Sequence, residues 1–174
     1  MNIKTKDNLV VIVAGIGMLL STLDTGIINV ALPFLKSYFE TTADIAAIAV
    51  TGYTISLAVF ILPFGLLSDK FGKLSFSYIG LIIFGLSSLL CGLSANVQML
   101  IMFRIFQGIG AAALQATSAS LITTLVSAEK SSSAIGVLGI MIGVGPVLGP
   151  SLGGLLLSLN SWRGIFWLNI PFVL

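Results

Sequence analysis

The chain of 174 residues is too apolar to be a water-soluble domain. Hydrophobic residues make up 57% of it and charged residues only 8%, and its mean hydropathy is +1.13. A soluble globular domain carries roughly 25% charged residues, so this composition excludes a surface that faces water on all sides. The chain has no histidine and one cysteine, Cys91, which excludes histidine acid–base chemistry, a thiol–metal cluster and an intramolecular disulfide. Any proton chemistry must use a carboxylate.

Five apolar segments are long enough to cross a bilayer, for which a helix needs roughly 20 residues. They are predicted at about residues 9–32, 45–67, 74–93, 97–122 and 134–159. A sixth span begins near residue 164 and reaches residue 174, a rise of about 15 Å, half the hydrocarbon thickness. We therefore expect an all-α integral membrane fold in which residues 1–174 form one transmembrane bundle with a truncated sixth helix. The chain is expected to be an N-terminal fragment.

The charged residues between the spans predict how the chain crosses the membrane. With the N-terminus in the cytoplasm, the cytoplasmic side receives five basic residues: Lys4, Lys6, Lys70, Lys73 and Lys130. The outer side receives only Lys36 and Arg163. This distribution obeys the positive-inside rule. It predicts a multi-pass protein of the inner or plasma membrane with a cytoplasmic N-terminus.

Two ionisable residues fall well inside the predicted spans, Asp24 in the first and Arg104 in the fourth. A charged side chain in the bilayer costs at least ~2.5 kcal/mol, so it usually faces protein or water and has a function. Each lies on a polar stripe of its helix. The stripes consist of Ser21, Thr22, Asp24, Thr25 and Asn29 in the first span, and of Arg104, Gln107, Gly108, Ala111, Gln115 and Ser118 in the fourth. They predict a hydrated central cavity; the alternative is a buried ion pair or polar clamp that only holds helices together.

The predicted fifth span is rich in glycine and proline. Small residues spaced four apart let two helix backbones approach closely. Such pairs are Gly139/Gly143, Gly145/Gly149 and Gly149/Gly153. Pro146 and Pro150 each remove a helical donor and predict bending of the segment. Close packing alone explains the glycines, whereas glycines combined with prolines favour a helix that bends or slides against another.

Residues 65–73 are predicted to form a cytoplasmic loop between the second and third spans. Asp69 can accept backbone N–H groups at a helix start, and Gly72 permits a tight turn with positive φ. Lys70 and Lys73 are placed to interact with the negatively charged inner leaflet. These features alone describe an ordinary hairpin turn between membrane helices.

Five short motifs follow one another along nearly the whole chain. They are LDTGIINVALP at 23–33, GLLSDKFGK at 65–73, RIFQGIG at 104–110, GPVLGPSLGG at 145–154 and WRGIFWLNIP at 162–171. In this order they resemble motifs of the major facilitator superfamily, specifically its fourteen-helix drug:proton antiporter branch. The chain departs from the family pattern at Leu74, where a third basic residue is usual, and at Gly164, which replaces a tryptophan.

The resemblance implies a fold and a set of site residues. The fold is the N-terminal six-helix bundle of a transporter whose second bundle is absent here, with substrate bound between the two bundles. The implied proton-coupling and transport residues are Asp24, Arg104, Gln107 and Gln115. The implied conformational loop contains Gly65, Asp69, Lys70, Gly72 and Lys73. The implied antiporter motif, which is largely confined to exporters, contains Gly145, Pro146, Gly149, Pro150, Gly153 and Gly154.

The resemblance favours proton-driven efflux of hydrophobic or cationic drugs by alternating access, with no cofactor, metal or nucleic acid. Asp24 would attract a cation or carry a proton, Arg104 would tune that carboxylate, and the fifth helix would slide against the missing C-terminal half. One alternative is a truncated membrane protein that does not transport, or a half-bundle that needs a partner. Another is a metabolite transporter of the same superfamily. An enzyme is not expected, because the sequence offers no nucleophile with a base beside it and no metal-ligand constellation.

Overall fold

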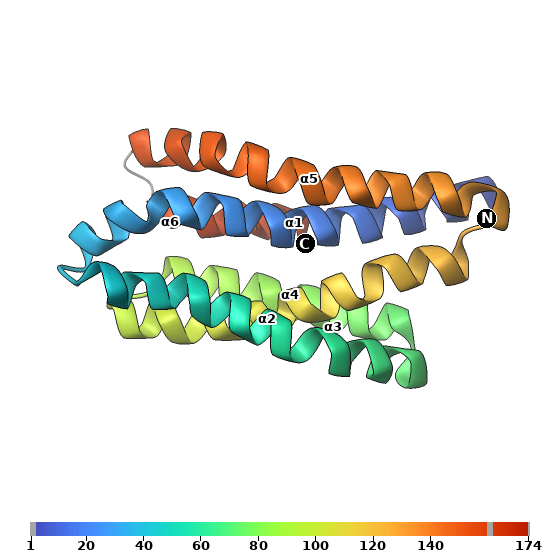
Figure 1. Ribbon diagram of the computed structural model, residues 1–174, viewed down its shortest axis with the longest axis horizontal. Coiled ribbons are helices and arrows are strands. Elements are labelled where there is room, and N and C mark those ends of the chain that lie inside the picture. Colours follow the sequence, from blue (N-terminus) through green and yellow to red (C-terminus); the bar gives the residue numbers. More distant parts are fainter. Residues whose placement is uncertain (1–2, 160–161, 174) are drawn as a thin grey trace.

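The computed structural model describes residues 3–159 and 162–173 and shows a bundle of helices (Figure 1). The elements are α1 (Ile3–Tyr38), α2 (Ala43–Phe71), α3 (Lys73–Gly92), α4 (Val97–Leu125), α5 (Ala128–Ser158), α6 (Trp162–Trp167) and the 3-10 turn η1 (Ile170–Phe172). The described residues contain no strand, which confirms the all-α prediction.

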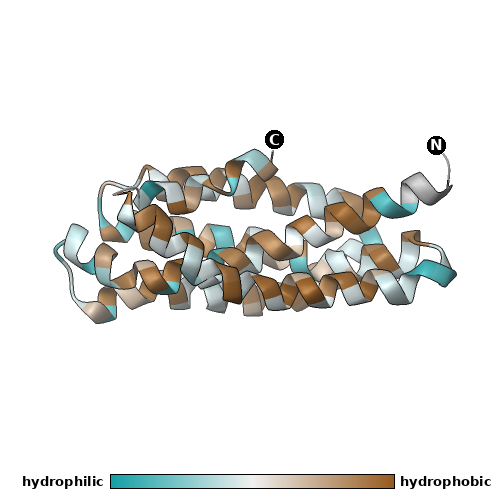
Figure 2. Ribbon diagram, turned by 90° about the horizontal axis from the view of Figure 1, so that it is seen from above, coloured by the Kyte–Doolittle hydropathy of each residue, from teal (hydrophilic) through white to brown (hydrophobic). Residues whose placement is uncertain are grey.

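The first five helices are each long and apolar enough to cross a membrane. Large apolar side chains cover the outside of the bundle, and Leu62, Leu66 and Val147 are 71%, 68% and 72% exposed. Figure 2 shows hydrophobic residues along the length of the helices. A helix satisfies its own backbone hydrogen bonds, so such a surface is stable in lipid. The chain is therefore an integral membrane protein.

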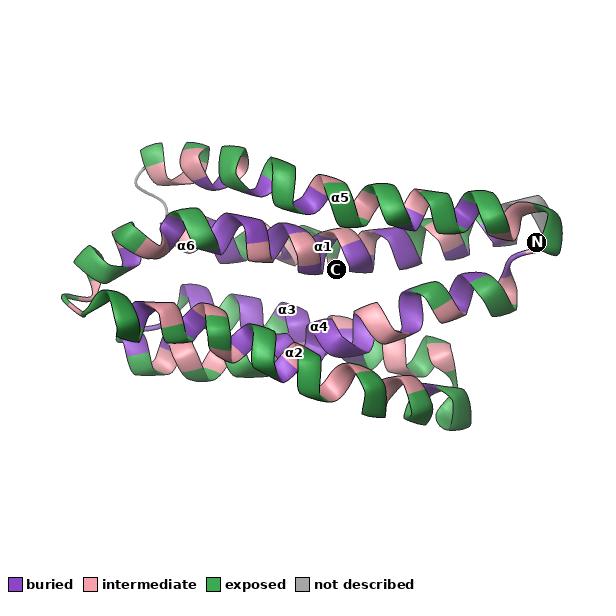
Figure 3. Cartoon of the chain, in the orientation of Figure 1, coloured by how far each residue is buried: buried purple, intermediate pink, exposed green. Residues whose placement is uncertain are grey.

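Helices α1 and α4 form the centre of the bundle. Helix α1 packs chiefly against α5, α4 packs chiefly against α2 and α3, and α1 and α4 meet between these two groups. In Figure 3 the buried residues gather on α1 and α4, whereas exposed residues dominate α5. In the most apolar 18-residue stretch of each helix, 61% of α1 and 56% of α4 is buried, against 17% of α5. Polar side chains of α1 and α4 can therefore reach one another away from lipid.

The interface between α1 and α5 depends on glycine. A Cβ atom added to Gly149 would lie 2.6 Å from the Cα atom of Gly26, and one added to Gly153 would lie 3.2 Å from the carbonyl oxygen of Ile27. Gly145 is equally tight against Thr22. The two backbones thus touch where only glycine leaves room, as the small-residue pattern predicts for this stretch.

The same interface separates the glycines of the fifth span into two groups. Added Cβ atoms on Gly139 and Gly143 would meet no described atom within 4 Å, so these residues do not form a close-packed pair. At 100° per residue, Gly143 points roughly 200° away from Gly145 and therefore lies on the opposite side of α5. The side with Gly145 and Gly149 is already occupied by α1. The opposite side, with Gly143, is exposed, so the expectation that α5 slides against a second bundle stays a prediction.

The predicted loop at 65–73 is wrong in its extent. Gly65, Asp69 and Lys70 belong to α2, which continues to Phe71, and only Gly72 separates it from α3. Gly72 has φ of 103°, the left-handed region in which a side chain is strained, so one glycine suffices for the turn. Asp69 lies in the last turn of α2 and pairs with Lys73 across the junction at 3.2 Å, rather than at a helix start.

The predicted helix at 164–174 is also wrong in its extent. Helix α6 ends at Trp167, and the chain continues as the 3-10 turn η1. Pro171 has no N–H group, so the helical hydrogen bond that this residue would donate cannot form. Asn169 already donates its N–H to the carbonyl of Phe166 at 3.2 Å, a 3-10-type bond. This break places Asn169 at the end of α6, facing the interior.

The two ends of the bundle differ in charge. The start of α1, the α2–α3 turn and the α4–α5 turn lie at one end, on the right in Figure 1, together with Lys70, Lys73 and Lys130. Lys36 and Arg163 lie at the other end, where Arg163 donates to the hydroxyl of Tyr38 at 3.1 Å. The helices therefore group the charged loops as the sequence predicts.

Candidate functional site

Asp24 of α1 and Arg104 of α4 form an ion pair in the centre of the bundle. Arg104 Nη1 donates to Asp24 Oδ2, and both side chains are fully buried. The pair is enclosed, so the prediction that these residues line a hydrated cavity is wrong for this conformation. Opposite charges attract strongly in a medium of low dielectric constant, which favours direct contact between the two helices over a water-filled gap.

The guanidinium of Arg104 is held on several sides. Its Nε donates to the carbonyl of Ala49 on α2 at 3.2 Å, and its Cζ lies 4.2 Å from the ring centroid of Tyr53. Its Nη1 also donates to Gln107 Oε1 at 2.7 Å. The remaining nitrogen, Nη2, is buried and has no hydrogen-bond partner among residues 3–159 and 162–173. A buried donor without a partner costs free energy.

Two amide side chains donate to the carboxylate of Asp24 from two further parts of the chain. Gln107 Nε2 lies 3.1 Å and Asn169 Nδ2 lies 3.3 Å from Asp24 Oδ1. The same two nitrogens lie 2.7 and 3.2 Å from the hydroxyl oxygen of Ser88 on α3. Three donors therefore surround the ionised carboxylate. We call the set Asp24, Arg104, Gln107, Ser88 and Asn169 the polar cluster.

Sequence reasoning found three members of the polar cluster and missed the others. Ser88 lies on α3 in a stretch rich in leucine and has no charge to mark it. Tyr53, which packs on Arg104 beside the polar cluster, was missed as well. Asn169 stood within the recognised motif at 162–171 but received no role. A signal was present, since an amide between apolar residues inside a predicted span is costly to bury without partners.

The other candidate residues lie outside the polar cluster. Gln115 donates to the hydroxyl of Ser21 at 3.1 Å, and so joins α4 to α1 at a separate place. The residues predicted as a conformational loop lie at the junction of α2 and α3. Of the residues predicted as an antiporter motif, Gly145, Gly149 and Gly153 pack against α1, whereas Pro150 is exposed and a Cβ added to Gly154 would meet no described atom within 4 Å. The sequence-predicted site is thus divided among four regions: the polar cluster, the contact of Gln115 with Ser21, the junction of α2 and α3, and the interface between α1 and α5.

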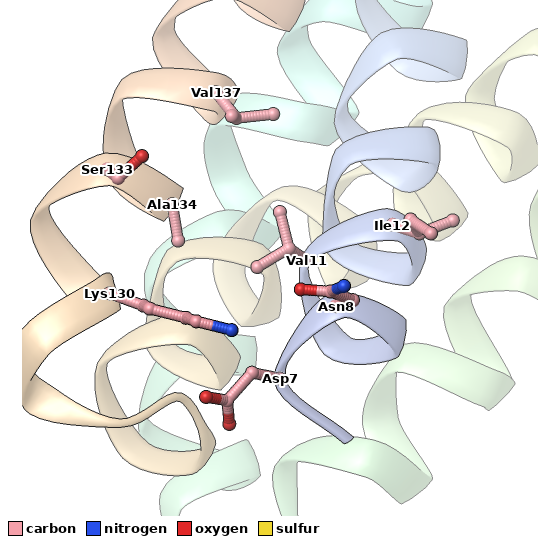
Figure 4. A pocket seen from close by; sticks show the side chains of 8 residues that line it. All are labelled: Asp7, Asn8, Val11, Ile12, Lys130, Ser133, Ala134 and Val137. Atoms are coloured by element: carbon pink, nitrogen blue, oxygen red, sulfur yellow. The ribbon is translucent and has the colours of Figure 1, made fainter. Parts of the chain in front are cut away.

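A separate cleft of about 410 Å³ opens between α1 and α5 at the lysine-rich end (Figure 4). Polar side chains, Asp7 and Lys130 among them, line one part of it, and Val11, Ile12 and Val137 line the rest. The buried carboxylate of Asp7 accepts a hydrogen bond of 2.7 Å from Ser127, which ties α1 to the α4–α5 turn. Seventeen residues separate Asp7 from Asp24 on one helix, a rise of about 25 Å. The cleft is therefore distinct from the polar cluster.

These features define a multi-spanning helical membrane protein with a charged cluster between its two central helices. Residues 14–174 match the Major Facilitator Superfamily, and the chain belongs to that family, as its motifs predict. Members of this family are transporters and not enzymes.

Three relatives illustrate the range of the family. The chain is 37% identical to riboflavin transporter RibZ of Clostridioides difficile over 94% of its own length and 36% of that protein. It is 37% identical to multidrug resistance protein Stp of Mycobacterium tuberculosis, over 94% of its own length and 30% of that protein. It is 36% identical to the methylenomycin A resistance protein of Bacillus subtilis, over 93% of its own length and 35% of that protein. The chain thus spans about a third of the length of these relatives.

The solved structures agree on the fold. A bacterial homologue of the human lysosomal transporter Spinster, in an inward-facing and occupied conformation, matches 97% of this chain and 43% of its own with a TM-score of 0.79. The identity is 20%. The fold predicted from the motifs, part of a major facilitator bundle, is therefore confirmed.

Proposed function

We propose that this chain forms the N-terminal bundle of a proton-coupled exporter of hydrophobic or cationic compounds. The observation that carries the proposal is the burial of Asp24 against Arg104. The chain has six acidic residues and no histidine, and Asp24 is the acidic residue that lies in the middle of a span. A carboxylate buried in a membrane protein marks a proton or ion pathway by default.

The ion pair supplies a way to couple proton binding to a change of shape. When Asp24 is ionised, it attracts Arg104 and the two central helices are held together. When a proton neutralises Asp24, that attraction is lost, while the desolvated guanidinium must find other acceptors or water. The contact between α1 and α4 then weakens. Alternating access requires two alternately populated arrangements of the two bundles, and the loss of this contact gives protonation a means to favour one of them.

The relatives support export and also favour a second candidate substrate class. Two of the relatives are named for multidrug and methylenomycin A resistance, and the fifth-span motif resembles one largely confined to exporters. A third is named as a riboflavin transporter, which favours a metabolite as an alternative substrate. Either substrate would bind between this bundle and a second one, which the longer relatives have room to supply.

Replacing Arg104 with lysine in the full-length protein tests the proposal. Lysine keeps the positive charge but lacks the planar fork of donors that contacts Asp24, Gln107 and Ala49. We expect Arg104→Lys to insert and bind substrate while losing pH-driven flux in proteoliposomes, with binding measured separately. Coupled flux at the wild-type rate would reduce Arg104 to a structural clamp.

We also propose that the lysine-rich end of the bundle faces the cytoplasm of a cell whose inner or plasma membrane holds the protein. The charge bias between the two ends supports this orientation. Single cysteines at Lys36 and Lys73, in a Cys91→Ala background, should react differently with an impermeant thiol reagent in intact cells. Labelling at position 36 alone fits the proposal, and labelling at position 73 alone refutes it.

A further inference from the structure

We propose that Asn169 is the partner that accepts the hydrogen bond of Asp24 when Asp24 is protonated, and that it does so by rotating its amide group. This inference rests on the proposed function, since it assumes that Asp24 takes up a proton. Asn169 is 1% exposed and contacts the carboxylate directly. It is a positioning residue for the proton site that no motif role assigns.

The ionised and protonated carboxyl groups need different surroundings. An ionised carboxylate only accepts hydrogen bonds, whereas a protonated one carries an O–H donor that requires an acceptor. Asp24 is surrounded by donors: Arg104 on Oδ2, and Gln107 and Asn169 on Oδ1. A guanidinium has no acceptor to offer. After protonation of Oδ1, at least one amide must therefore present its oxygen to the acid.

The two amides differ in their freedom to turn. Gln107 Oε1 accepts from Arg104 Nη1 at 2.7 Å and contacts Cys91 Sγ at 3.7 Å. Turning Gln107 would place its NH₂ group against the guanidinium, donor against donor. Asn169 Oδ1, in contrast, is buried and has no hydrogen-bond partner within the described ranges of the chain. When the amide of Asn169 rotates, Oδ1 takes the place of Nδ2 next to Asp24. The oxygen breaks no hydrogen bond in doing so, because it had none to the described residues.

The remaining neighbours of Asp24 do not offer the same exchange. The charged and titratable groups that face it are Arg104 of α4, Tyr53 of α2 and Cys91 of α3. Tyr53 donates its hydroxyl to the carbonyl of Ser21 at 3.1 Å, and Cys91 is directed to Gln107. The charged residues of α5 and α6 lie at the ends of the bundle. Asn169 is thus the neighbour whose bonding can follow the proton.

Asn169 also connects the protonation of Asp24 to a different part of the chain. It follows α6 and precedes η1, and its backbone N–H is bonded to the carbonyl of Phe166. Residue Val173, one turn further on, packs against Gly85 of α3. A change in the Asn169 amide therefore acts on the segment that leaves α6, in addition to the contact between α1 and α4.

Infrared difference spectroscopy of the full-length protein, between acid and alkaline pH, tests the inference. The carbonyl band of protonated Asp24 is identified by its loss in Asp24→Asn. Loss of the acceptor in Asn169→Ala should move this band to higher wavenumber, because the acid O–H is no longer bonded. The matched control is Asn29→Ala, which removes an exposed amide that bonds only within its own helix, to Thr25 at 2.9 Å. It should leave the band unchanged.

A second variant separates positioning from folding. Asn169→Asp keeps the size and an acceptor oxygen but adds a negative charge, so the hydrogen bond from protonated Asp24 becomes charge-assisted and the Asp24 band should not move to higher wavenumber. Export should shift toward higher pH, since a neighbouring like charge favours proton binding. In Asn169→Ala, kcat for export should fall about tenfold with little change in KM, equivalent to about 1.4 kcal/mol, the size of one net hydrogen bond.

The outcomes distinguish this inference from the proposed function. An Asp24 band that is present and identical in wild type and Asn169→Ala overturns the role of Asn169 and leaves proton coupling intact. Absence of any Asp24-dependent band at acid pH overturns both, because Asp24 then takes no proton. The result expected is a band that moves to higher wavenumber in Asn169→Ala, does not do so in Asn169→Asp, and is unchanged in Asn29→Ala.

Discussion

Helix α1 has two interfaces of opposite chemistry. Toward α5 it presents Gly26 and Thr22, which lie against Gly145 and Gly149 with no room for larger side chains. Toward α4 it presents Asp24, which is surrounded by charged and amide donors. One interface is held by close packing of backbones and the other by buried electrostatics.

The difference shows that one helix can have one interface that is insensitive to protonation and another that depends on it. Packing between α1 and α5 depends on shape alone, so it is the same whether or not a proton is present. The contact between α1 and α4 depends on the charge of Asp24 and changes when that charge is neutralised. We infer that α1 and α5 move as one unit, while the polar cluster responds to protons.

The largest expected effect is the removal of one charge from the ion pair. Arg104→Leu leaves Asp24 buried without its partner, and Asp24→Leu does the same to Arg104, so each should destabilise the full-length protein by about 3–5 kcal/mol. The double variant Asp24→Leu/Arg104→Leu should recover most of this loss, because no charge remains uncompensated. Thermal unfolding in detergent measures all three.

Export should not recover together with the unfolding free energy in these three variants. The double variant restores the packing of α1 on α4 but has no proton acceptor, so pH-driven export should stay abolished. A double variant that exports at the wild-type rate would mean that the polar cluster only holds the helices together. A double variant as unstable as either single one would mean that the amide bonds, rather than the ion pair, dominate the energetics of the interface.

A smaller effect is expected at the glycine interface. Gly149→Leu places a side chain where Gly26 already lies, and overpacking of this kind costs typically about 1–3 kcal/mol. Export should fall with stability, and equally at all pH values. The matched control is Gly143→Leu, on the same helix but with no described atom within 4 Å of its added Cβ, which should insert and fold as wild type. Equal behaviour of the two variants in an unfolding assay would contradict the packing assignment.

The sequence predicts the fold well because the membrane leaves few choices. Runs of apolar residues specify the five long helices, since backbone groups in lipid must be satisfied within a helix. The extents of α2 and α6 were less accessible. Whether 65–71 continues a helix depends on the single left-handed Gly72. The end of α6 depends on the bond from Asn169 N–H to the carbonyl of Phe166 and on Pro171, which has no N–H to donate.

The candidate site was predictable only in part. Asp24 and Arg104 stand out because charge is rare and costly inside a span. Their direct pairing required knowing that α1 and α4 meet in the centre, which no local pattern reports. Ser88 and Asn169 carry no charge, and their importance arises from contacts with residues at least 19 positions away in sequence, which no local pattern reports.

The central claim is that Asp24 carries the proton that is exchanged for substrate. Addition of substrate to the full-length protein, in weakly buffered detergent solution, should release protons from the wild type. Asp24→Asn should still bind substrate but release no protons, because an amide does not give up a proton in neutral aqueous solution. Proton release from Asp24→Asn equal to that of the wild type, at the same substrate occupancy, would contradict the account.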